Sequence, residues 1–195
     1  MRSKWGRIFL GAVLLSCLFV NTALAADKLE ARKAELRGKV ASVLQLLYSK
    51  EPLAKKAVEG NAGYAVFANS GYKLGLFGSG HGRGMAVNNG TGEEVYMKMQ
   101  EYSVGLGIGA KEYAVVFIFL NNEAYKKFTT SNWKWGAQAE AAATDGVVGD
   151  EFKSATKVGT GIWAYQMTTK GLTAELNLKG SNYYKDSSYY PKAKK

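Results

Sequence analysis

Few side chains of this 195-residue chain are of the types that usually carry catalysis or bind metals. The sequence contains one histidine, His81, and one cysteine, Cys17. A Ser-His-Asp or Cys-His catalytic centre needs a histidine, and His81 is the one candidate in the sequence. One cysteine excludes an intramolecular disulfide framework and a cysteine-rich metal site. The sequence also lacks an HExxH motif and an acidic calcium-binding loop. We therefore expect no enzyme, no metal and no cofactor.

The glycine-rich segment Gly78–Gly84 looks at first like a phosphate-binding loop. A dinucleotide-binding fingerprint needs glycine at the sixth position of this segment, where Arg83 stands, and a helix after it. The strand-like Met85–Val87 follows instead, and no Gly-Lys-Ser/Thr loop occurs in the sequence. We therefore assign neither nucleotide binding to this loop nor a catalytic role to His81.

Glycine recurs at every second position in three parts of the chain. Residues i and i+2 of a strand share a face, so each set strips one face of side chains. Within strands, glycine usually marks sharp curvature or close approach of another backbone. The sets are consistent with a ligand cleft or with a small, strongly curved sheet, and we favour the curved sheet. They are Gly78, Gly80, Gly82 and Gly84; Gly105, Gly107 and Gly109; and Gly159 and Gly161.

The segment from Asp27 to Leu47 has helical periodicity and combines an apolar stripe with flanking cations. The stripe consists of Leu29, Leu36, Val40, Val43, Leu44 and Leu47. The cations are Lys28, Arg32, Lys33, Arg37 and Lys39. Such a helix can insert leucines at a membrane surface while each cation near anionic headgroups contributes about 1 kcal/mol. A stripe of this width also serves to pack a helix on a sheet, so both interpretations stay open.

The first 25 residues are expected to be an export signal. A basic start precedes an apolar run from Ile8 to Val20, which is short for a transmembrane helix, and Ala23–Ala25 predicts cleavage before Ala26. Removing this segment with its three cations lowers the net charge from +10 to +7. Leu14–Cys17 resembles a lipobox, so a lipoprotein acylated at Cys17 is the minority alternative. The remaining basic residues are scattered without a nucleic-acid-binding signature, and we expect no nucleic-acid partner.

After Gly60 the pattern changes from helical to strand-like. Short apolar or alternating runs are separated by turn residues, notably at Asn69–Gly71 and Asn88–Gly92. The expected strands cover residues 64–67, 74–77, 85–87, 95–99, 104–108, 113–120, 133–143, 161–167 and 172–178. Further helical segments are expected at Pro52–Gly60 and Asn121–Phe128.

This order of elements predicts an α+β fold. We expect N-terminal helices packed on a strongly curved, mostly antiparallel, glycine-rich sheet that could be barrel-like. A single domain would cover residues 26–185, between the signal peptide at 1–25 and a basic tail at 186–195. The segment from Asn182 onward is expected to fray.

Four segments in order are similar to the motifs of the SYLF family. Glu59–Phe67 resembles the family's opening strand, and Gly80–Gly84 resembles its G-x-G-R-G turn. Ser103–Ala110 resembles its S-x-G segment, and Tyr165–Gly180 resembles the closing segment around K-G-L. The resemblance covers nearly the whole chain after the predicted signal. The family consists of lipid-binding domains and includes actin-patch proteins of yeast and many exported bacterial proteins.

The resemblance implies lipid binding without catalysis. Eukaryotic members are linked to phosphoinositides, and their membrane contact is attributed to an N-terminal amphipathic helix. Actin binding belongs to particular eukaryotic members, and the bacterial type of export signal argues against it here.

We therefore expect an exported, periplasmic or envelope-associated bacterial protein that binds anionic phospholipid headgroups peripherally. The residues expected to carry the affinity are Lys28, Arg32, Lys33, Arg37 and Lys39. The alternative is a structural or interaction protein of the envelope, which binds another protein through Trp133, Trp135 and Trp163. An integral outer-membrane barrel is disfavoured, because most expected strands are shorter than the roughly 9–11 residues that span a bilayer.

Overall fold

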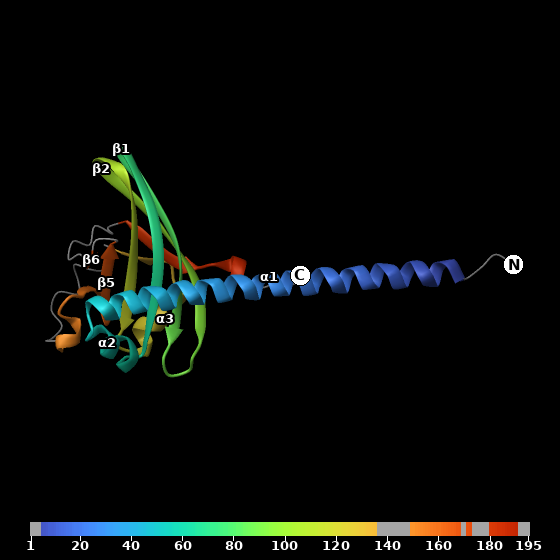
Figure 1. Ribbon diagram of the computed structural model, residues 1–195, viewed down its shortest axis with the longest axis horizontal. Coiled ribbons are helices and arrows are strands. Elements are labelled where there is room, and N and C mark those ends of the chain that lie inside the picture. Colours follow the sequence, from blue (N-terminus) through green and yellow to red (C-terminus); the bar gives the residue numbers. More distant parts are fainter. Residues whose placement is uncertain (1–4, 136–148, 169–170, 173–179, 191–195) are drawn as a thin grey trace. The chain divides into compact units, whose positions relative to one another are not determined.

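The computed structural model describes residues 5–135, 149–168, 171–172 and 180–190 (Figure 1). Side chains are described for these residues except 5–25, 70–78, 103–111 and 171–172. The chain divides into two compact units, Met1–Glu35 and Leu36–Lys195. Helix α1 (Trp5–Lys50) forms the described part of the first unit and begins the second. No helix within the described ranges has an apolar stretch long enough to cross a bilayer.

The three α-helices of the described residues confirm the predicted helical segments. α1 includes the expected segment 27–47, and α2 (Ala54–Gly60) follows it. α3 (Asn122–Thr130) begins where the side chain of Asn121 accepts a hydrogen bond of 2.9 Å from the backbone N–H of Ala124. This bond satisfies one of the free N–H groups of the first turn, so the local sequence defines the start of α3.

The sheet contains seven strands in the described residues, and all their pairings are antiparallel. They are β1 (Gly63–Asn88), β2 (Glu94–Phe119), β3 (Trp133–Lys134), β4 (Thr156–Gly159), β5 (Ile162–Thr168), β6 (Gly171–Leu172) and β7 (Ser181–Lys185). β2 is the central strand. It pairs with β1 on one side, and on the other with β7 at Met97–Glu101 and with β5 at Tyr113–Phe119. The predicted α+β class with an antiparallel sheet is confirmed.

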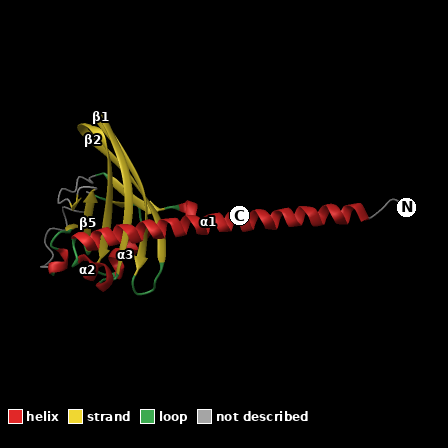
Figure 2. Cartoon of the chain, in the orientation of Figure 1, coloured by secondary structure: helices red, strands yellow, loops and turns green. Residues whose placement is uncertain are grey.

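β1 and β2 form one long hairpin of two 26-residue strands that bends sharply along its length (Figure 2). The expected turn at Asn69–Gly71 and the division into several short strands are therefore wrong. Pairing continues through this region, with a one-residue register shift between Gly75 and Phe77. Glycine and a bulge allow the paired strands to curve without interrupting the ladder. The predicted turn after Asn88 does exist and joins β1 to β2.

The bend brings the tip of the hairpin back to the beginning of β1. The N–H of Asn89 donates to the carbonyl of Ala62 at 3.0 Å, and its side chain donates to the carbonyl of Asn61 at 2.8 Å. Between its two ends, β1 folds back so that its first and second halves pass close to each other. A Cβ atom on Gly84 would lie 2.3 Å from the carbonyl oxygen of Val66, and one on Gly82 would lie 1.7 Å from Asn69 Oδ1. Alternate glycines thus permit close backbone approach in a strongly curved sheet, as predicted.

The curled sheet encloses an aromatic core. The rings of Phe67 and Tyr183 have centroids 4.8 Å apart, and those of Phe117 and Phe128 are 5.0 Å apart. Phe128 comes from α3, so this helix closes part of the core. Edge-on and tilted ring pairs of this kind add to the hydrophobic contribution of burial.

The end of the chain does not fray as expected over residues 182–190. β7 is followed by a 3₁₀ turn at Ser187–Tyr189, and Tyr189 stacks on Tyr96 with ring centroids 4.8 Å apart and planes 11° apart. The buried aromatic side chains hold this segment on the sheet. Most of the predicted strands 133–143 and 172–178, and the final residues 191–195, lie outside the described residues.

Substitution of Gly84 tests whether this close crossing is required. In Gly84→Ala the new methyl group meets a backbone carbonyl, so we expect a loss of about 1–3 kcal/mol in the free energy of unfolding. The matched control is Gly38→Ala, because Gly38 lies in α1 with nothing within 4 Å of an added Cβ. Alanine there should stabilise by about 0.5–1 kcal/mol. Urea unfolding of both variants measures the difference, and equal midpoints would contradict the crossing.

Candidate functional site

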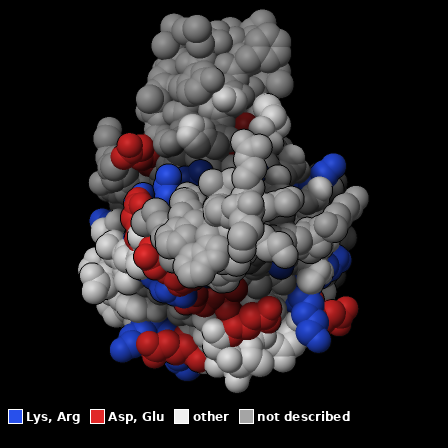
Figure 3. Space-filling model, turned by 90° about the vertical axis from the view of Figure 1, so that its right-hand side faces the viewer, with Lys and Arg blue, Asp and Glu red and all other residues white. Residues whose placement is uncertain are grey.

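The predicted lipid-binding cations all lie on α1 but are divided between the two units. Lys28, Arg32 and Lys33 belong to the first unit, whereas Arg37 and Lys39 belong to the second. Lys28, Arg37 and Lys39 are exposed, and the other two are partly exposed. Lys33 forms a salt bridge of 2.8 Å with Glu30, one turn earlier. On the face shown in Figure 3, basic and acidic side chains are interspersed.

The apolar stripe of α1 is used for packing within the second unit. Leu36 and Val40 are each 5% exposed, and Leu47 is fully buried. Of the two interpretations of this helix, packing is therefore confirmed for the part that begins at Leu36. The buried residues are not available to enter a bilayer while this packing persists.

Arg37 is the cation with the most strongly defined environment. Its guanidinium donates three hydrogen bonds of 2.7–2.9 Å to the two carboxylate oxygens of Glu94, at the start of β2. The hydroxyl of Tyr96 donates to the same carboxylate at 2.5 Å, and the guanidinium lies 6.0 Å from the centroid of the Tyr96 ring. A bidentate arginine–carboxylate pair is geometrically specific, so Arg37 fixes α1 on the hairpin.

The C-terminal segment reinforces the same region. The backbone N–H of Tyr96 donates to the hydroxyl of Tyr190 at 2.9 Å, and the ammonium of Lys185 lies 3.9 Å from the centroid of the Tyr190 ring. Arg83, next to the glycine at which β1 crosses itself, lies 3.8 Å from the buried carboxylate of Asp186. These contacts assign a structural role to cations that a count of charges alone would place on a free surface.

The sequence analysis missed a buried polar cluster on the inner face of the sheet. Glu101 and Tyr113 are each 5% exposed, and the Tyr113 hydroxyl donates a short hydrogen bond to Glu101 Oε2. Ser181 is fully buried and pairs with Glu101 across β2 and β7. The alternation of Val95, Met97 and Met99 already indicates that Glu101 points inward. That signal was available in the sequence but was not used.

Burial raises the pKa values of several tyrosines in this domain. It is the largest cause of a raised pKa for Tyr113, where the Glu101 carboxylate adds to the effect. Burial and Glu101 also raise the pKa of Tyr183, while the Ser181 hydroxyl opposes this shift. Burial, with a smaller contribution from Glu59, raises the pKa of Tyr48 to about 12. Burial is likewise the main cause of the raised pKa values of Tyr64, Tyr125 and Tyr165.

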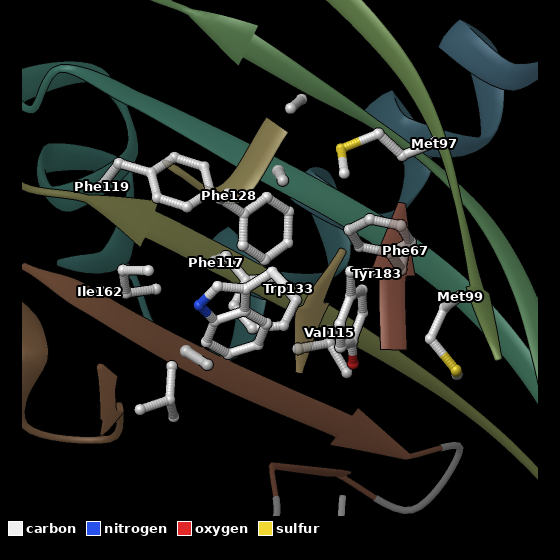
Figure 4. Close-up of a cluster of buried hydrophobic side chains, with 14 of the residues drawn as sticks. Phe67, Met97, Met99, Val115, Phe117, Phe119, Phe128, Trp133, Ile162 and Tyr183 are labelled. Atoms are coloured by element: carbon white, nitrogen blue, oxygen red, sulfur yellow. The ribbon is translucent and has the colours of Figure 1, made fainter. Parts of the chain in front are cut away.

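The other candidate residues of the sequence analysis have ordinary environments. Trp133 and Trp135 are buried in the aromatic core (Figure 4 labels Trp133), so they are not the exposed protein-binding anchors that the alternative function requires. Trp163 packs on Phe152 with ring centroids 5.2 Å apart. His81 is exposed on β1. No group of three or more metal-ligating side chains occurs in the part of the chain that the structure describes.

Two comparisons with known proteins place this chain among its relatives. Residues 100–190 match the family model Ysc84, described as "Las17-binding protein actin regulator". A curated protein of Aeromonas veronii, Beta cell expansion factor A, is 37% identical over 142 residues, which are 72% of this chain and 52% of that protein. The chain thus spans about half the length of this relative. The matches confirm the SYLF resemblance that the sequence motifs predict.

The raised tyrosine pKa values predict unfolding in alkali. In an unfolded chain, tyrosine ionises near pH 10, whereas burial keeps these side chains neutral in the folded state. The stability that this provides is complete below about pH 10 and is lost as the pH rises further. Absorbance at 295 nm and circular dichroism, followed together, should show that part of the 12 tyrosines ionise only as the fold is lost. Ionisation of all of them near pH 10 with an unchanged spectrum would contradict the prediction.

Proposed function

We propose that this protein binds anionic phospholipid surfaces peripherally and without catalysis, because residues 100–190 match the Ysc84 family model. The family is associated with actin and lipid binding and is in general not enzymatic. The observation that carries the proposal for this chain is the group of cations on α1. We further propose that the protein is exported and acts in the periplasm or at the envelope, where actin is not a partner.

Packing of α1 makes the proposed interaction mainly electrostatic. Leu36, Val40 and Leu47 of the apolar stripe are buried in the domain, so these side chains add little to binding as long as this packing persists. Exposed cations near an anionic surface contribute about 1 kcal/mol each, and this attraction decays over about 8 Å at physiological salt. Binding should therefore be sensitive to salt. The envelope protein partner stays a weaker candidate, because Trp133 and Trp135 are buried.

Flotation with vesicles tests the proposal directly. The purified protein should float with anionic vesicles at low salt, and neither with zwitterionic vesicles nor at high salt. Charge reversal at Lys28 and Arg32 should weaken the apparent affinity by at least about tenfold, because two attractions of about 1 kcal/mol become repulsions. The matched control reverses Lys126 and Lys127, two exposed residues of α3. Equal loss in both pairs would contradict a role for α1, and absence of flotation would reject membrane binding.

Substitution of Glu94, the partner of Arg37, provides an independent test because it should strengthen vesicle binding instead of weakening it. In Glu94→Gln the carboxylate bound by Arg37 becomes a neutral amide, which weakens this pairing and strengthens the attraction of the guanidinium to anionic headgroups. We expect anionic vesicles to bind about fivefold more tightly, which corresponds to one additional cation. Glu93→Gln is the control, because it removes the same charge from the neighbouring exposed residue. Identical affinities of these two variants would show that Arg37 does not contribute.

A further inference from the structure

The inner face of the curled sheet becomes polar toward the bend of the hairpin. Asn69 of β1 pairs with Tyr113 of β2, which pairs in turn with Thr168 of β5. On the other half of the hairpin, Glu101 pairs with Ser181 of β7. The hydrogen bond between Tyr113 and Glu101 joins these two rows of residues across the inner face. Asn69 and Glu101 each lie two residues, and therefore one inward-facing position, beyond Phe67 and Met99 of the hydrophobic core.

Several buried polar atoms on this face lack a hydrogen-bond partner among the described residues. Both side-chain amide atoms of Asn69 are unpartnered, although this residue is only 5% exposed. Gln166 Oε1 is also unpartnered, and Gln166 pairs with Val115, one inward position from Tyr113. Buried polar groups without partners are rare and costly in folded proteins, and several on one face point to a missing ligand or to bound water.

The charge of this region restricts the ligand. Glu101 is the one acidic side chain among the residues of these rows that the structure describes, and none of their described members is a lysine or arginine. An anion would be repelled by the carboxylate. A divalent cation is usually bound by more than one carboxylate. A singly charged group that donates several hydrogen bonds matches both the charge and the free acceptors.

We propose that Asn69, Glu101 and Gln166 form an internal site for a primary ammonium group. A primary ammonium group has three N–H donors, and the amide oxygens of Asn69 and Gln166 are unpartnered acceptors beside the Glu101 carboxylate. Glu101 supplies the countercharge, and the amide oxygens of Asn69 and Gln166 accept the other hydrogen bonds. The ammonium could belong to a free small amine or to the ethanolamine headgroup of a phospholipid. This site is formed by the inner face of the sheet and does not involve the cations of α1.

Titration of the isotopically labelled full chain with ethanolamine hydrochloride, followed by NMR, tests the site. We expect saturable shifts of the Asn69 side-chain amide and of the indole N–H of Trp133, which lies beside Tyr183 with ring centroids 5.7 Å apart. Ethylene glycol is the neutral analogue of similar size and should give no saturable shift. Glu101→Gln should weaken the apparent affinity by about tenfold or more, since the countercharge of the ammonium is lost while one acceptor oxygen is retained. Glu112→Gln removes the same charge from an exposed position of β2 and should not change the affinity.

The outcomes distinguish the proposal from its alternatives. Equal shifts with ethylene glycol or with potassium chloride, or no saturation, would overturn it, and these comparisons in the unmutated protein do not depend on a variant that folds. Vesicles of phosphatidylcholine with and without phosphatidylethanolamine separate the two sources: shifts only with the ethanolamine lipid assign a headgroup, and shifts only with the free amine assign a small ligand. Glu101→Gln should float with anionic vesicles like the unmutated protein, so failure of this site and failure of the α1 surface are separate results.

Discussion

The close crossing of β1 with itself is the constraint on which the rest of the structure depends. At Gly84 the second half of the strand passes so near the carbonyl of Val66 that no side chain fits between them. This crossing turns a flat hairpin into a curled one, and the inner face of the hairpin encloses the aromatic core. It also brings Glu101 to Tyr113, twelve positions further along β2. Curvature, core and internal polar cluster thus have one common cause.

The curled hairpin is secured from outside by charge and aromatic contacts at one end. Arg37 of α1 binds Glu94, while Tyr189 and Tyr190 of the C-terminal segment contact Tyr96 two residues later. Segments from both ends of the second unit therefore meet at the start of β2. Two parallel hydrogen bonds give such a pair a more specific geometry than an ordinary surface ion pair has. The same pair withdraws one cation from the surface proposed to bind lipid.

Local patterns in the sequence were sufficient for the elements but not for their long-range arrangement. The stripe from Leu36 to Leu47 predicted a helix, and the alternate glycines predicted curvature, because both signals depend on near neighbours. Asn69–Gly71 was interpreted as a turn, since the same residue types serve in turns and in bent strands. Gly84 and Val66 lie in the two halves of one strand, and no pattern among neighbouring residues predicts their close approach. The pair Arg37–Glu94 is likewise distant in sequence, whereas the inward position of Glu101 follows from strand alternation alone.

The two proposed binding sites differ in their exposure to solvent. The cations of α1 act through solvent, so mobile ions screen them and their attraction weakens as salt rises. Glu101 lies in a buried environment in which screening is weak and a hydrogen-bonded cation is held by short-range contacts. Raising the salt concentration therefore distinguishes the two interactions without any mutation. Loss of vesicle binding at high salt, together with retained ammonium binding inside the sheet, is what this difference in environment requires.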